Sequence, residues 1–210
     1  MTVLTAPLPV TAPQSHVTIP HGIIDDRRGT WGMVLFIVTE ACLFVLLFFS
    51  YFYLGHLSRG PWPPEPPNLS LALVMLAVLL ASSGTLYWGE QAERRGSVLS
   101  ARLAIALTVV LGVIFMALQA AEYREHLTTL RPTSNAYGSI FYTITSFHGL
   151  HLLLGLLMLV YVLLLPEIGP AHKPPHRSLT NAALYWHFVD AVWVVIVAML
   201  YIAPNVGIGR

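Results

Sequence analysis

The stretch SIFYTITSFHGLHLLLGLLMLVYVLLL, residues 139–165, decides the fold because it contains no charged residue and is long enough to cross a membrane. A bilayer core of about 30 Å is crossed by about 20 helical residues. Four more apolar runs occur in the chain, and like the first they contain neither Lys nor Arg: 31–54, 69–88, 103–123 and 182–203. We therefore predict an all-α, polytopic membrane bundle of five transmembrane helices over residues 31–203, with tails at 1–30 and 204–210.

The composition supports a membrane protein and excludes other classes. Hydrophobic residues make up 56% of the 210 residues and charged residues only 10%, whereas soluble domains have about 25% charged residues. Such apolar content also argues against disorder. The formal net charge of +1 leaves no basic patch for nucleic acid. A single cysteine, Cys42, excludes a disulfide framework and a cysteine metal knuckle.

The basic residues predict the orientation. With five spans, the N-terminal tail shares a side with the second and fourth loops. More basic residues fall on that side (Arg27, Arg28, Arg94, Arg95, Arg102, Lys173, Arg177) than on the other (Arg59, Arg124, Arg131, Arg210). The positive-inside rule then predicts a cytoplasmic N-terminus and an external C-terminus.

Six ionisable residues lie inside the predicted spans, and they are the candidate functional residues: Glu40, Glu122, Asp190, His148, His151 and His187. A charge at the bilayer centre costs about 3 kcal/mol on insertion scales, so such residues indicate a site. Because no Lys or Arg lies at their depth, a carboxyl there should be protonated, or bonded to a histidine or water.

Depth and spacing sort these residues. His148 and His151 lie on one helix face, and so do His187 and Asp190, because both pairs are three residues apart. Glu40 lies about 13 Å from the cytoplasmic start of the first span, and His151 lies about 18 Å from the outer start of the fourth. We therefore expect Glu40 to be protonated and bonded to His151.

Structural explanations remain open for several of these residues. Glu40 could serve only as a polar contact between helices. Glu122, near a span end beside Tyr123 and Arg124, is expected to be an interfacial residue. Three histidines could in principle hold haem iron, but neighbours on one face cannot bind opposite sides of one haem. We expect no metal site in this chain.

Four motifs carry a resemblance to a known family, in order along residues 27–203: WGMVLFIVTEACLF with Glu40, LQAAEYREH with Glu122, FYTITSFHGLHLLLG with His148 and His151, and ALYWHFVDAVWVV with His187 and Asp190. They resemble subunit III of haem–copper terminal oxidases, the cytochrome c oxidase subunit III family. The family's longest form has seven helices, and this chain resembles the five-helix bacterial form that lacks the first two.

The resemblance implies an accessory subunit without catalytic residues or redox cofactors, whose partners carry the haem and copper. It implies direct packing against subunit I, a complex that includes subunit II and a small subunit IV, bound phospholipid, support of proton uptake, and a bacterial inner membrane.

Roles for individual residues are expected within such a subunit. Glu40 would lie near the subunit I contact, with His151 and His148 as its candidate polar partners. His187 and Asp190 would tie the fifth helix to the first or fourth. Lipid head groups would be met by three residues at the cytoplasmic edge: Arg27, Arg28 and Trp31.

Other functions stay open at this point. The same subunit occurs in quinol oxidases, and a subunit III-like protein accompanies nitric oxide reductase. An independent proton-coupled transporter could use Glu40 and Asp190 as carriers, although five helices without symmetric halves argue against it.

Overall fold

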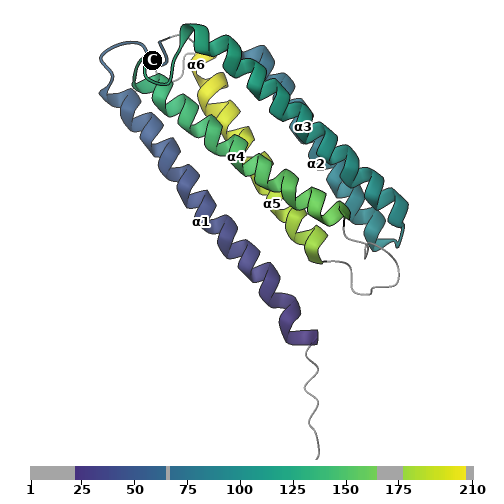
Figure 1. Cartoon of the computed structure of the whole chain (residues 1–210). Helices are drawn as coiled ribbons and strands as arrows, with labels where there is room; N and C mark the ends of the chain where they lie inside the picture. Colours follow the sequence, from purple (N-terminus) through teal and green to yellow (C-terminus); the bar gives the residue numbers. More distant parts are fainter. Residues whose placement is uncertain (1–21, 65–66, 165–176, 207–210) are drawn as a thin grey trace, which may run out of the picture.

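A computed structural model of the chain describes residues 22–64, 67–164 and 177–206, which form one bundle of five long helices (Figure 1). The helices are α1 (Gly22–Leu57), α2 (Leu69–Arg94), α3 (Val98–Thr129), α4 (Ala136–Leu164) and α5 (Arg177–Ile196), the last continued by a π-helical turn, η1 (Val197–Ile202), and by α6 (Ala203–Asn205). Within these described ranges, five helices are long and apolar enough to cross a membrane. The predicted all-α, five-helix membrane fold is confirmed.

The helices extend beyond the apolar runs that predicted them. α1 begins at Gly22, so residues 22–30, which were expected to belong to the tail, are helical. A helix satisfies its own backbone hydrogen bonds, so polar residues can continue it past the hydrocarbon region. Residues 1–21 and 207–210 of the expected tails lie outside the described residues.

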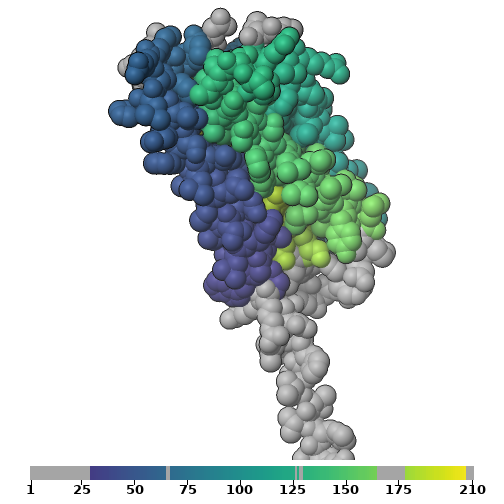
Figure 2. Space-filling view, turned by 60° about the vertical axis from the view of Figure 1, so that its left-hand side comes forward, coloured from purple at the N-terminus to yellow at the C-terminus, as the bar shows by residue number. Residues whose placement is uncertain are grey.

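α4 and α5 occupy the middle of the bundle. α2 and α3 pair closely on one side, and α1 lies on the other side against α4 and α5 (Figure 1). Figure 2 shows α1 packed alongside α4. The membrane span of α1 is the least buried of the five, with Leu35, Val45 and Phe49 each more than 60% exposed. In a membrane this surface faces lipid or another chain.

Small residues let the central helices approach one another around Trp186 of α5. A Cβ atom on Gly112 of α3 would lie 2.7 Å from the indole Cη2, and one on Gly155 of α4 would lie 3.0 Å from its Cε3. Trp186 is fully buried, and its indole N–H donates to the hydroxyl of Ser82 on α2, at 3.0 Å. This side chain therefore joins α2, α3 and α4 to α5.

The two ends of the bundle differ. Residues 58–64 and 67–68, the α3–α4 connection at 130–135 and residues 203–206 gather where α1 ends and α4 begins (Figure 1); we call this the proline-rich end. At the opposite end α2 and α3 are joined by a tight turn in which Gly96 has φ 76°. Glycine adopts this left-handed conformation without steric cost, which suits the end of a helix.

Candidate functional site

Glu40 of α1 and His151 of α4 form a hydrogen-bonded pair within the membrane-spanning part of the bundle. Oε2 of Glu40 lies 2.8 Å from Nε2 of His151, and the two side chains are 21% and 6% exposed. The expected contact between these two residues is therefore present.

The other ring nitrogen of His151 defines where its proton lies. Nδ1 is 2.7 Å from the carbonyl oxygen of Phe147, one turn back on α4. A carbonyl only accepts hydrogen bonds, so Nδ1 carries a hydrogen, and in a neutral ring Nε2 must then accept. Glu40 must supply the proton between them, either as a carboxylic acid or by having transferred it to the ring. In both forms the pair holds the same number of protons and has no net charge.

Aromatic side chains lie beside His151. Phe44, only 2% exposed, meets the His151 ring edge-on with the ring centroids 5.0 Å apart. The Tyr185 hydroxyl of α5 donates to the backbone carbonyl of His151 at 3.3 Å, and Phe36 stacks on Tyr185. Weakly polar surroundings strengthen the hydrogen bond between the carboxyl and the imidazole.

Neither ring nitrogen of His148 has a hydrogen-bond partner among the described residues, so its expected role as a second polar partner of Glu40 is wrong. Its ring is fully buried, stacks on Trp193 of α5 with centroids 4.8 Å apart, and meets Phe115 of α3 edge-on. Although His148 and His151 are close along the helix, they turn toward different neighbours.

His187 and Asp190 are joined through Ser83 of α2. The Ser83 hydroxyl donates to Oδ2 of Asp190 and lies 2.9 Å from Nδ1 of His187. The direct distance from Nδ1 of His187 to Oδ2 of Asp190 is longer, at 4.0 Å. The expectation that they tie the fifth helix to the first or fourth is wrong, because the contact is with α2. Sequence reasoning missed Ser83, for which the only signal is the run of hydroxyl residues that begins at Ser82.

Glu122 of α3 turns into the bundle instead of lying exposed at the interface. It is 1% exposed, and Oε1 accepts a hydrogen bond of 2.8 Å from the Tyr201 hydroxyl. Tyr201 belongs to η1, where the Ala203 N–H bonds to the carbonyl of Ala198, five residues back. Pro204 has no N–H and its ring crowds the preceding turn, which favours this widening. The sequence reasoning missed Tyr201.

The remaining candidates are described only in part. Trp31, near the start of the first membrane span, is 65% exposed. The side chains of Arg27 and Arg28 lie outside the described residues. Within the described ranges no three His, Cys, Asp or Glu side chains come together in a way that could hold a metal ion.

The fold and site together define a class: a multi-pass helical membrane protein that holds a carboxyl–imidazole pair at membrane depth. Residues 17–204 match the family described as Cytochrome c oxidase subunit III. The chain belongs to this family, whose members are subunits of an oxidoreductase complex. Membership implies a complex with other oxidase subunits.

Individual relatives agree with the family match. A probable cytochrome c oxidase subunit 3 of Nocardia farcinica is 38% identical over 187 residues, which cover 86% of this chain and 91% of the relative. A similarly named protein of Mycobacterium tuberculosis is 36% identical over 188 residues, with the same coverage. The cytochrome c oxidase subunit 3 of Scyliorhinus canicula is 39% identical over 197 residues, covering 90% of this chain and 73% of the relative.

Proposed function

We propose that this chain is an accessory subunit that supports proton uptake by the oxidase and stabilises subunit I, without a catalytic site of its own. The Glu40–His151 contact carries this proposal. A carboxyl and an imidazole 2.8 Å apart can exchange a proton without creating net charge in the membrane. That property suits a group that holds a proton near a pumping centre.

The haem and copper of the complex belong, in this proposal, to the partner subunits. Both ring nitrogens of His151 are engaged, and Nδ1 of His187 lies beside Ser83. The ring of His148 is packed between Trp193 and Phe115, which leaves no space for a porphyrin over it. The chain separated from all other subunits should show no Soret absorption and no stoichiometric copper; a retained haem would contradict the proposal.

Partners and location follow from the family and the charge pattern. The exposed face of α1 near Glu40 supports a direct contact with subunit I, in a complex that also contains subunit II and a small subunit IV. The relatives' names support cytochrome c as the electron donor. The surplus of basic residues on the N-terminal side supports a cytoplasmic N-terminus in a bacterial inner membrane.

Bound phospholipid is also part of the proposal. Arg27, Arg28 and Trp31 lie at the start of the first span, where basic and aromatic residues favour anionic head groups. The 65% exposure of Trp31 is consistent with such a contact.

Glu40→Gln in the assembled oxidase tests the proton-supporting role. An amide can donate a hydrogen bond to Nε2 of His151 but cannot release a proton. We expect normal assembly, an initial oxygen consumption rate near that of the parent complex, and a faster loss of activity during sustained turnover. Glu90→Gln, which changes a partly exposed carboxyl near the end of α2, is the control and should leave both rates unchanged.

Two results would contradict this role. An immediate and complete loss of oxygen reduction in the assembled Glu40→Gln complex would make Glu40 an obligatory proton carrier. Sustained turnover equal to that of Glu90→Gln would leave Glu40 with a structural role only.

A further inference from the structure

Several buried polar atoms lack a hydrogen-bond partner within the described part of the chain, and many of them lie between the bundle centre and the proline-rich end. They are both ring nitrogens of His148, Oε1 of Gln119, Nε1 of Trp193 and the hydroxyl of Tyr137. Gln119, His148, Tyr137 and Trp193 are each at most 5% exposed. Buried polar groups in native proteins are satisfied by protein or by ordered water, so this grouping needs an explanation.

His148, Trp193 and Tyr137 belong to a continuous series of neighbouring rings, and Oε1 of Gln119 lies beside Gly149, the residue that follows His148. The Trp193 ring lies 4.8 Å from His148 and 6.4 Å from Tyr201, centroid to centroid. Phe141 bridges Tyr201 to Tyr137, at 6.0 and 5.9 Å. The series therefore leads from mid-membrane toward the proline-rich end.

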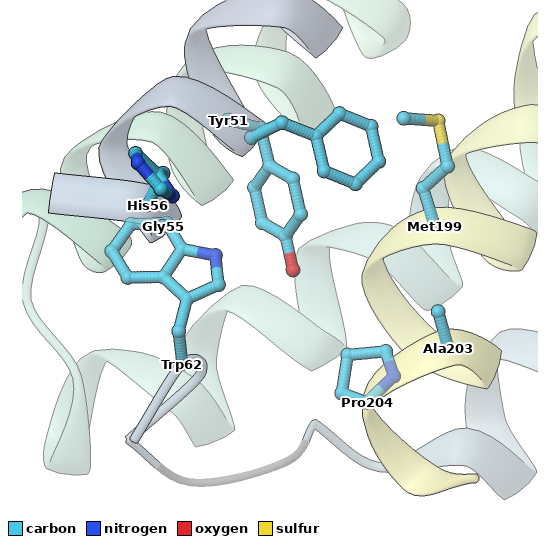
Figure 3. Close-up of a pocket in the computed structure, with 8 residues that line it drawn as sticks. Tyr51, Gly55, His56, Trp62, Met199, Ala203 and Pro204 are labelled. Carbon is cyan, nitrogen blue, oxygen red and sulfur yellow. The ribbon is translucent and has the colours of Figure 1, made fainter. Parts of the chain in front are cut away.

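The series ends at a pocket. Tyr137 lies 5.3 Å from Trp62 and 6.3 Å from Tyr51, again between centroids, and both neighbours line a cavity of about 360 Å³. Figure 3 shows the Tyr51 hydroxyl directed into this cavity, between Trp62 and Pro204. The cavity reaches the molecular surface, because its lining includes the exposed side chain of His56.

The polar atoms along this series match what water requires. A neutral His148 ring offers one donor and one acceptor, the Gln119 oxygen accepts, and the Trp193 N–H donates. A buried water typically makes two to four hydrogen bonds to such groups.

We propose that bound water occupies this series from the pocket to His148 and exchanges with the aqueous phase at the proline-rich end. The water gives a mid-membrane imidazole access to that phase by a route that does not include the Glu40–His151 pair. This inference goes beyond the proposed function, and it stands whether or not Glu40 supports proton uptake.

X-ray radiolytic footprinting of the intact oxidase complex tests the proposal, because hydroxyl radicals formed from bound water oxidise the side chains beside it. Trp193 and Trp186 are a matched pair: both lie on α5 and are fully buried, but the Trp186 N–H already donates to Ser82. We expect Trp193 to be oxidised several-fold faster than Trp186. Equally slow oxidation of the two would overturn the proposal without need of any variant.

The entry route is tested by mixing the complex rapidly with ¹⁸O-labelled, deoxygenated water shortly before the X-ray exposure. Ala203→Leu places a larger side chain in the lining of the pocket, and Ala77→Leu places the same side chain on the exposed face of α2 as a control. We expect slower appearance of ¹⁸O in Trp193 for Ala203→Leu and the parent rate for Ala77→Leu. An unchanged rate in an assembled Ala203→Leu complex would overturn the route through the pocket.

Discussion

His148 and His151 lie three residues apart on α4, but His151 bonds to Glu40 of α1 whereas His148 stacks on Trp193 of α5. One turn of helix thus contributes an imidazole to each of two separate environments. The first holds a pair that can share a proton, and the second is an aromatic interior without a carboxyl beside the ring. The two histidines should therefore respond differently to substitution.

Removing the hydrogen-bond donor of Glu40 should cost more than removing its acidity. Glu40→Leu leaves Nε2 of His151 buried without a donor, a loss that typically costs about 1–3 kcal/mol. Glu40→Gln keeps a donor to Nε2 and should cost less than about 1 kcal/mol. The measurement is the temperature at which the purified complex loses this subunit. Equal losses for the two variants would show that His151 does not depend on the hydrogen bond.

The Ser83 hydroxyl should contribute to stability out of proportion to its size. Ser83→Ala leaves Oδ2 of Asp190, a residue only 4% exposed, without its donor, at a cost of about 1–3 kcal/mol. Thr143→Ala is the control, because the Thr143 hydroxyl bonds to the Ser139 carbonyl of its own helix and lies away from α1. A dissociation temperature for Ser83→Ala equal to that of Thr143→Ala would refute this role.

The sequence predicts the five spans because each requires only a sufficiently long apolar run. It also predicts the Glu40–His151 pair, since counting residues from opposite faces of the membrane places both near the same depth. Both predictions use distances along helix axes, which follow from the number of residues in each helix.

Contacts that depend on helix rotation were not predictable in the same way. The partner of His187 and Asp190 depends on which face of α2 turns toward α5, and a serine in an apolar run does not reveal that. The burial of Glu122 depends on the π-helical turn that brings Tyr201 inward. His148 shares a face of α4 with His151, but its ring meets Trp193 of α5 and not Glu40 of α1, which the three-residue spacing does not reveal.

The predicted orientation can be tested with topology reporters. A reporter fused to the N-terminus should be active only on the cytoplasmic side, and one inserted after Pro64 should be active only outside. The reason is the surplus of basic residues on the N-terminal side of the bundle. An external N-terminus would place the proline-rich end on the cytoplasmic side of the membrane. It would also place the proposed lipid contacts at Trp31 on the external side.

The two helical glycines Gly112 and Gly84 should give opposite results when replaced by alanine. In an exposed helix the change from glycine to alanine is favourable by about 1 kcal/mol. At Gly84 a Cβ would meet no atom within 4 Å, so we expect this gain in full.

At Gly112 the new Cβ would lie 2.7 Å from both Leu156 and Trp186. Leu156 can rotate away, but the Trp186 ring is held between Gly112 and Gly155 and by its bond to Ser82. Overpacking of this kind typically costs about 1–3 kcal/mol, which exceeds the gain in helix propensity. The Gly112→Ala complex should therefore release this subunit at a lower temperature than the parent, and the Gly84→Ala complex at a higher one. A Gly112→Ala subunit as stable as Gly84→Ala would show that α3 and α5 can move apart freely, and that Trp186 does not lock the centre of the bundle.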